Sequence, residues 1–106
     1  MTFTFADTAN PADVEKSIRE NTRLILTETP GEPDAQAHGH PGDLEIARKR
    51  RVLHAVDNTF LTPFYQRPLE LGADLAIHST TKYMDGHNAT VGGAVVAPAR
   101  RNCTTR

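Results

Sequence analysis

The sequence AIHSTTKYMDGH, residues 76–87, changes abruptly from a short apolar run to hydroxyl residues, a lysine and a glycine. The apolar start predicts a buried strand, and the residues after it predict a turn at the carboxyl end of that strand. A lysine amine at a strand end can form a Schiff base with a carbonyl group, and hydroxyl and backbone N–H groups beside it can bind a phosphate. Lys82, flanked by Ser79 and Thr81, is therefore the first candidate for chemistry.

Strand and helix patterns alternate along the rest of the chain. Asn10 and Pro11 predict the start of a helix, because Asn suits the N-cap and Pro the first helical position. Alternation of this kind predicts βαβ units, and hence an α/β fold with a mainly parallel sheet. Strands are expected over residues 2–6, 23–27, 52–56, 75–78 and 94–97, and helices from Pro11, over residues 44–51 and over residues 68–71.

Asp57 directly follows the strand expected over residues 52–56. Ligands gather beyond the carboxyl ends of parallel strands, so Asp57 is expected near Ser79 and Lys82. A carboxylate there can pair with a protonated ring nitrogen, as pyridoxal 5'-phosphate requires. The prediction is a pyridoxal phosphate site with Lys82 as catalytic residue and Asp57, Ser79, Thr81 and Lys82 binding the cofactor. Taken alone, each part also fits a capped turn, with Asp57 or the Ser/Thr residues as caps.

The composition is that of one ordinary globular domain. The 106 residues carry a formal charge of -1 and are 38% hydrophobic. No apolar run approaches the roughly 20 residues that a membrane span needs, and no signal-peptide pattern opens the chain, so a cytoplasmic location without membrane association is expected. The single cysteine, Cys103, gives no disulfide framework.

Basic and histidine residues suggest neither a nucleic-acid partner nor a metal. The run Arg48-Lys49-Arg50-Arg51 lacks interleaved aromatic residues and is interpreted as the solvated end of a helix, so no nucleic acid is expected. His78 and His87 have no nearby cysteine or carboxylate at ligand spacing, and the loop histidines His38 and His40 are only a weak tract. No metal site is therefore predicted.

Residues 56–74, continuing through residues 78–87 to Gly92-Gly93, closely resemble the Cys/Met-metabolism family of pyridoxal-phosphate enzymes. This family includes cystathionine γ-synthase, cystathionine lyases, methionine γ-lyase and O-acyl-homoserine sulfhydrylases. Residues 5–30 also resemble the family. By position, the resemblance implies that Lys82 is the Schiff-base lysine and acid/base, that Asp57 pairs with the ring nitrogen, and that Ser79 and Thr81 bind phosphate.

The resemblance also implies the surroundings of the site. The family's large domain is a mainly parallel, doubly wound α/β sheet of the aspartate-aminotransferase type, and its members are homo-oligomers, tetramers of dimers that share sites. Residues 1–106 are expected to form an incomplete version of that domain, with a polar tail over residues 98–106. The family's Gly-rich phosphate loop, ring-stacking tyrosine and substrate-carboxylate arginine have no counterparts in these residues.

Residues 31–44 depart from the family pattern although the spacing to Val56 is unchanged. Glu32 stands where the family usually has an Asn that contacts the cofactor. Read one nucleotide later, the codons for residues 32–36 can encode Asn-Pro-Thr-Leu-Lys, as the family pattern expects. The hypothesis is a compensated frameshift, which the coding DNA would test, and the polar, glycine-containing stretch over residues 34–42 is expected to form a mobile loop.

Three functions follow from these observations. The first is pyridoxal-phosphate-dependent transsulfuration, with elimination or replacement at Cβ or Cγ of a sulfur-containing amino acid or O-acyl-homoserine. The alternative is an inactive remnant of such an enzyme with little or no cofactor binding, and the isolated chain is expected to be inactive. A third candidate, an unrelated phosphate-binding α/β module, lacks the expected Gly-rich loop at the start of a helix.

Overall fold

The computed structural model describes residues 1–30 and 41–99. Four strands form one sheet in the order in which they occur in the chain, β1 (Leu24–Glu28), β2 (Leu53–Asp57), β3 (Leu75–Ser79) and β4 (Gly93–Val96). The first three are parallel, whereas β4 runs antiparallel to β3. The predicted α/β class with a mainly parallel sheet is therefore confirmed, and β4 reverses direction because its connection to β3 contains no helical crossover.

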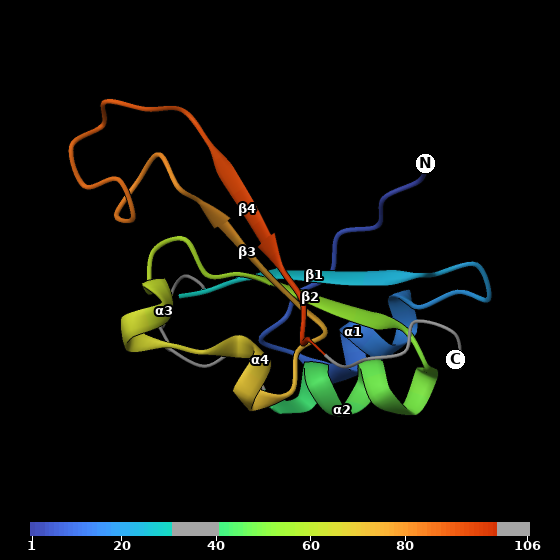
Figure 1. Ribbon diagram of the computed structural model, residues 1–106. Helices are drawn as coiled ribbons and strands as arrows, with labels where there is room; N and C mark the ends of the chain where they lie inside the picture. Colours follow the sequence, from blue (N-terminus) through green and yellow to red (C-terminus); the bar gives the residue numbers. More distant parts are fainter. Residues whose placement is uncertain (31–40, 100–106) are drawn as a thin grey trace.

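Helices precede and connect the parallel strands and cover one side of them. The four are α1 (Pro11–Ser17), α2 (Pro41–Arg50), α3 (Thr62–Tyr65) and α4 (Pro68–Leu71). In Figure 1, α1, α2 and α4 lie on the same side of β1 and β2. Contacts join α1 to α2, α2 to β2 and α4 to β3. The connections between the parallel strands therefore contribute helices that pack against the sheet.

Local sequence signals explain where these helices begin and end. The side chain of Asn10 accepts a hydrogen bond from the Ala12 N–H at 3.1 Å, which caps α1 as predicted. At the C-terminal end of α4, Gly72 adopts φ 109°, and its N–H donates to carbonyl groups of that helix. A left-handed residue closes a helix in this way at little cost only when it is glycine.

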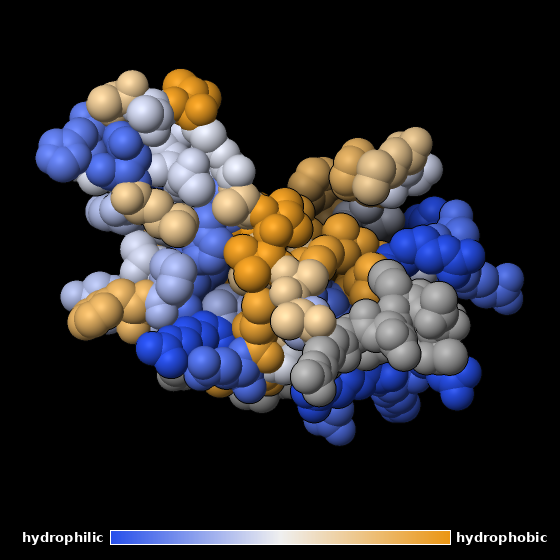
Figure 2. Space-filling model, viewed as in Figure 1, coloured by the Kyte–Doolittle hydropathy of each residue, from blue (hydrophilic) through white to orange (hydrophobic). Residues whose placement is uncertain are grey.

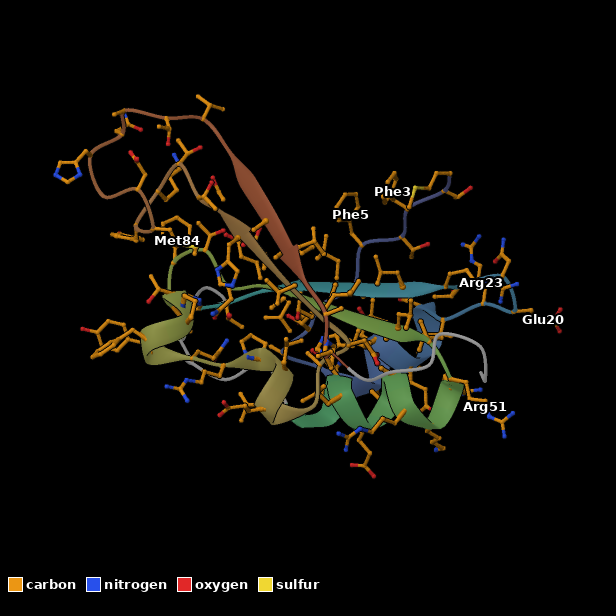
Figure 3. The ribbon with its side chains drawn as sticks, viewed as in Figure 1. Phe3, Phe5, Glu20, Arg23, Arg51 and Met84 are labelled. Atoms are coloured by element: carbon orange, nitrogen blue, oxygen red, sulfur yellow. The ribbon has the colours of Figure 1, made fainter. Side chains whose placement is uncertain are left out.

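Two predicted elements are wrong in part. Residues 2–6 form no strand, because an extended segment becomes a strand only by pairing and this one pairs with none of the described strands. Phe3 and Phe5 are exposed on it (Figure 3). The helix expected from Leu44 begins at Pro41, and proline is common at the first helical position, so residues 41–44 are helical rather than part of a loop. The rest of that predicted loop, residues 31–40, lies outside the described residues.

The basic run from Arg48 ends α2, as predicted, and contacts α1. Arg50 donates a hydrogen bond to Glu15 Oε1 at 2.9 Å, and Lys49 Nζ lies 3.6 Å from the same oxygen. The hydrogen bond from Arg50, helped by the charge of Lys49, lowers the pKa of the Glu15 carboxyl. Part of this positive charge is thus neutralised within the fold. Across residues 1–30 and 41–99, no helix has the length and apolar character to cross a membrane.

The two faces of the sheet differ in burial. Alternation along the strands places Thr27, His54, Val56 and Ala76 toward the helices, where all four are buried. The opposite face, called here the open face, carries Leu24, Leu26, Leu53, Leu75, Ile77 and Val95. Four of these six are exposed, and apolar surface extends across the centre of the molecule in Figure 2. The described helices therefore bury one side of a sheet whose other side is apolar and largely exposed.

Candidate cofactor site

Two of the predicted site residues lie at neighbouring strand ends. Asp57 is the last residue of β2 and Ser79 the last residue of β3. These strands are parallel and adjacent, with Asp57 in register with Ile77, and the Asn58 N–H extends the pairing by donating to the Ile77 carbonyl at 2.9 Å. The prediction that β2 and β3 bring Asp57 and Ser79 to one edge is therefore confirmed in geometry.

Thr59 connects these two strand ends directly. Its hydroxyl donates to Asp57 Oδ1 at 2.6 Å and accepts the Ser79 N–H at 2.7 Å. The Thr59 N–H donates to the same carboxylate oxygen at 3.0 Å. Oδ1 of Asp57 thus has two donors, and no described residue donates to Oδ2, which leaves that oxygen able to accept a proton donor such as a ring N–H.

Lys82 lies in the turn that follows Ser79. Its N–H donates to the Ser79 carbonyl at 3.3 Å, and its carbonyl accepts the Gly86 N–H at 2.9 Å. The Lys82 side chain is exposed. Beside it, the ring of Tyr83 packs edge-on against Phe60 with centroids 6.1 Å apart, so the loops after β2 and β3 contact each other next to the lysine.

The two hydroxyl residues predicted to bind phosphate differ in their contacts. Thr81 Oγ1 accepts the Gly92 N–H at 2.9 Å and donates to the Gly92 carbonyl at 3.3 Å. Within the described part of the chain, the Ser79 hydroxyl makes no hydrogen bond, whereas its backbone N–H is bound by Thr59. Ser79 is therefore ready to donate to an anion, and Thr81 would have to exchange its weaker bond to Gly92 to do so.

The loop between β3 and β4 is held by backbone donors. The Ala89 N–H donates to Asp85 Oδ2 at 2.9 Å, and this hydrogen bond lowers the pKa of the Asp85 carboxyl. The Asp85 N–H in turn donates to the Thr80 carbonyl at 2.9 Å. Met84 lies on this same loop in Figure 3. The turn that carries Lys82 is therefore closed by bonds on both sides of it.

A cluster of hydrogen-bonded amide side chains connects to the backbone of Asp57. Asn58 Nδ2 donates to the carbonyls of Thr62 and Gln66, and Gln66 Nε2 donates to Asn58 Oδ1 and to Thr29 Oγ1 at 2.7 Å. The Thr29 N–H completes the link by donating to the Asp57 carbonyl. Thr59 and this cluster were missed in the sequence. The Asp-Asn-Thr order does contain a signal for Thr59, because an Asp side chain often bonds the backbone two residues later.

The groups present fit a phosphorylated pyridine aldehyde. Asp57 can accept from the ring nitrogen, the Ser79 hydroxyl can donate to phosphate, and Lys82 can supply an amine from the adjoining turn. The described residues contain no group of three or more His, Cys, Asp or Glu side chains that could hold a metal. His38, His40 and Cys103 lie outside those residues. A mainly parallel α/β sheet with these groups at its carboxyl edge is the arrangement expected of the class of pyridoxal-phosphate-binding proteins.

Comparison with known proteins places the chain in one family of that class. The sequence profile of the "Cys/Met metabolism PLP-dependent enzyme" family matches residues 1–106, and the chain belongs to this family. It is 48% identical over 97 residues to cystathionine gamma-lyase of Bacillus subtilis and 41% identical over 101 residues to L-methionine gamma-lyase of Treponema denticola. These matches cover 92% and 88% of the chain.

Structure gives the same family. The fold matches a crystal structure of cystathionine gamma-lyase from Lactobacillus plantarum complexed with L-serine, with a TM-score of 0.83 and 39% sequence identity over 92% of the chain. The chain covers 26% of that structure and 26% of the Bacillus subtilis protein. It thus spans about a quarter of the length of the relatives it matches.

Proposed function

We propose that the chain binds pyridoxal 5'-phosphate at the carboxyl edge of β2 and β3 and belongs to an enzyme that eliminates or replaces a group at Cβ or Cγ of a sulfur-containing amino acid. The observation that carries this proposal is the Asp57–Thr59–Ser79 connection, which presents a free carboxylate oxygen next to the loop of Lys82. The family membership supports the cofactor. The names of the relatives, cystathionine and methionine lyases and a cystathionine synthase, support the substrate class.

Each residue of the site would have a separate task. Lys82 would hold the cofactor through its amine and afterwards carry a proton at Nζ. Asp57 would accept the ring N–H at Oδ2, and Ser79 and Thr81 would donate hydroxyl protons to the phosphate. When bound, the cofactor supplies an electron sink for a substrate carbanion.

The test compares lysines in pyridoxal phosphate binding. The chain mixed with the cofactor should develop the absorption band of a lysine-bound cofactor, and borohydride reduction followed by peptide mapping should find the label on Lys82. Lys82→Ala should remove the band, whereas Lys16→Ala, which changes another exposed lysine, should keep it. A band that survives Lys82→Ala would refute the assigned role.

Cofactor binding without turnover is a second candidate. It concerns these 106 residues tested by themselves, which correspond to about a quarter of the length of the relatives and, by the family resemblance, do not include the arginine that holds the substrate carboxylate. Substrate positioning contributes a large part of an enzymatic rate, so these residues without that arginine should show no turnover. The 106-residue chain, incubated with pyridoxal phosphate and cystathionine or methionine, should release no α-keto acid. Measurable release would favour the complete activity.

A further inference from the structure

We infer that Thr59 is a positioning residue that fixes which oxygen of Asp57 faces the cofactor. A hydroxyl has one proton to donate and two lone pairs to accept. Because the Ser79 N–H occupies a lone pair of Thr59 Oγ1 at 2.7 Å, the hydroxyl proton is left to point at Asp57 Oδ1, 2.6 Å away. The direction of this two-bond chain is set by the backbone of β3.

Short distances and burial make Thr59 more than a turn residue. Hydroxyl–carboxylate bonds of 2.5–2.7 Å fall in the range of the stronger, charge-assisted hydrogen bonds, and the Thr59–Asp57 bond lies within it. Thr59 is only 7% exposed, so water competes little for either bond. With the Thr59 N–H also on Oδ1, the carboxylate is held through one oxygen and turned so that the other is open.

Thr59 also couples the two halves of the site. Asp57 and the loop of Lys82 belong to different strands, and the Thr59 hydroxyl is the single atom bonded to both Asp57 and Ser79 among the described residues. A shift of the end of β3 would therefore change the position of the Asp57 carboxylate. This role depends on Asp57 pairing with the ring nitrogen, so it rests on the proposed function.

The first test needs no cofactor. Melting temperatures are measured for the unaltered chain, Asp57→Ala, Thr59→Val and the double variant. If the hydroxyl acts through Asp57, the losses overlap, and the double variant should melt about 4 °C or more above the value that simple addition predicts. Additive losses would overturn the inference. If Thr59→Val prevents folding, Thr59→Ala takes its place in the same four melting measurements, because it removes the hydroxyl without putting a methyl group in its place.

The second test uses pyridoxal phosphate as the probe. Thr59→Val should weaken its binding about tenfold, as expected for the loss of one charge-assisted bond, and Thr59→Ser should stay within about twofold because it keeps the hydroxyl. In an Asp57→Ala background Thr59→Val should have no further effect. Thr4→Val, an exposed threonine in the irregular N-terminal segment, is the matched control.

The outcomes separate the inference from the function beneath it. Equal weakening by Val and Ser at position 59, or none by either, would refute the positioning role while the Lys82-dependent band stands. Absence of that band in the unaltered chain would refute the proposed function, and the melting cycle would then decide the Asp57–Thr59 coupling alone.

Discussion

His54 is a buried titratable group, the second residue of β2. Its ring accepts or donates one bond with Thr27 Oγ1 at 3.0 Å, and its Nδ1 has no partner among the described residues. Burial lowers the pKa of His54 from the ordinary 6.5, although the charge of Asp74 acts in the opposite direction. The neutral ring is therefore the form that the fold accepts.

Acidification should consequently destabilise the chain. Below pH 6.5 the unfolded chain takes up a proton at this histidine while the folded chain does not, so the stabilisation is complete above that pH and decreases as the pH falls toward the lower folded-state pKa. The slope can reach about 1.4 kcal/mol per pH unit for one proton. Urea unfolding between about pH 5 and pH 8 should show a shallower dependence for His54→Gln, and the exposed His87→Gln should behave as the unaltered chain. Parallel curves for all three would contradict this.

At the same scale, the sequence could identify the charged and hydroxyl side chains but not their partners. Asp57, Ser79 and Lys82 stand out because their types match a chemistry. Thr59, Asn58 and Gln66 do not, since their importance lies in bonds to atoms of other elements. The hydrogen bond from Gln66 to Thr29 joins residues 37 positions apart, and no local sequence pattern predicts it.

Single elements were predictable where their signals are local. The cap of α1 and the end of α4 at Gly72 depend on residues within one turn, and both lie where predicted. The four-residue α3 was missed because no glycine marks its end, whereas the equally short α4 begins at Pro68 and ends before Gly72. The prediction of a strand over residues 2–6 was wrong because the composition suits a strand but does not determine whether the segment pairs with another strand.

Gly72 gives a prediction at this scale. An L-residue at φ 109° is strained, and the guanidinium of Arg48 lies where a Cβ would be added. Gly72→Ala should lower the free energy of unfolding by about 1–2 kcal/mol, mainly through the backbone because the Arg48 side chain can move. Gly93→Ala is the matched control, since its Cβ would meet the His78 carbonyl at an ordinary 3.5 Å. Equal losses in chemical denaturation would count against a backbone cause.

For the whole molecule, the open face is the dominant feature. Parallel sheets are normally covered on both sides, yet Leu24, Leu26, Leu53 and Val95 are exposed here. The sequence did predict strands with continuous apolar runs, which suit two-sided burial. It could not show which side the described helices cover, because that depends on how the crossovers pack.

An exposed apolar face of this kind should bind a hydrophobic dye. The folded chain should enhance the fluorescence of anilinonaphthalene sulfonate, and Leu26→Gln combined with Val95→Thr should roughly halve the enhancement. Val91→Thr changes an exposed valine in the loop before β4 and should have no effect. Unchanged fluorescence in the double variant would show that the dye binds elsewhere.

Neighbouring strands of the sheet also follow one another in the chain. The two sides of the proposed site are therefore synthesised one after the other. Residues emerge at about 5–20 per second, so β2 with Asp57 precedes the end of β3 at Ser79 by roughly one to four seconds. During that interval the Thr59 hydroxyl has no Ser79 N–H to accept. The proposed cofactor site is therefore incomplete until the ribosome has passed Lys82, and before that only its Asp57 side has been synthesised.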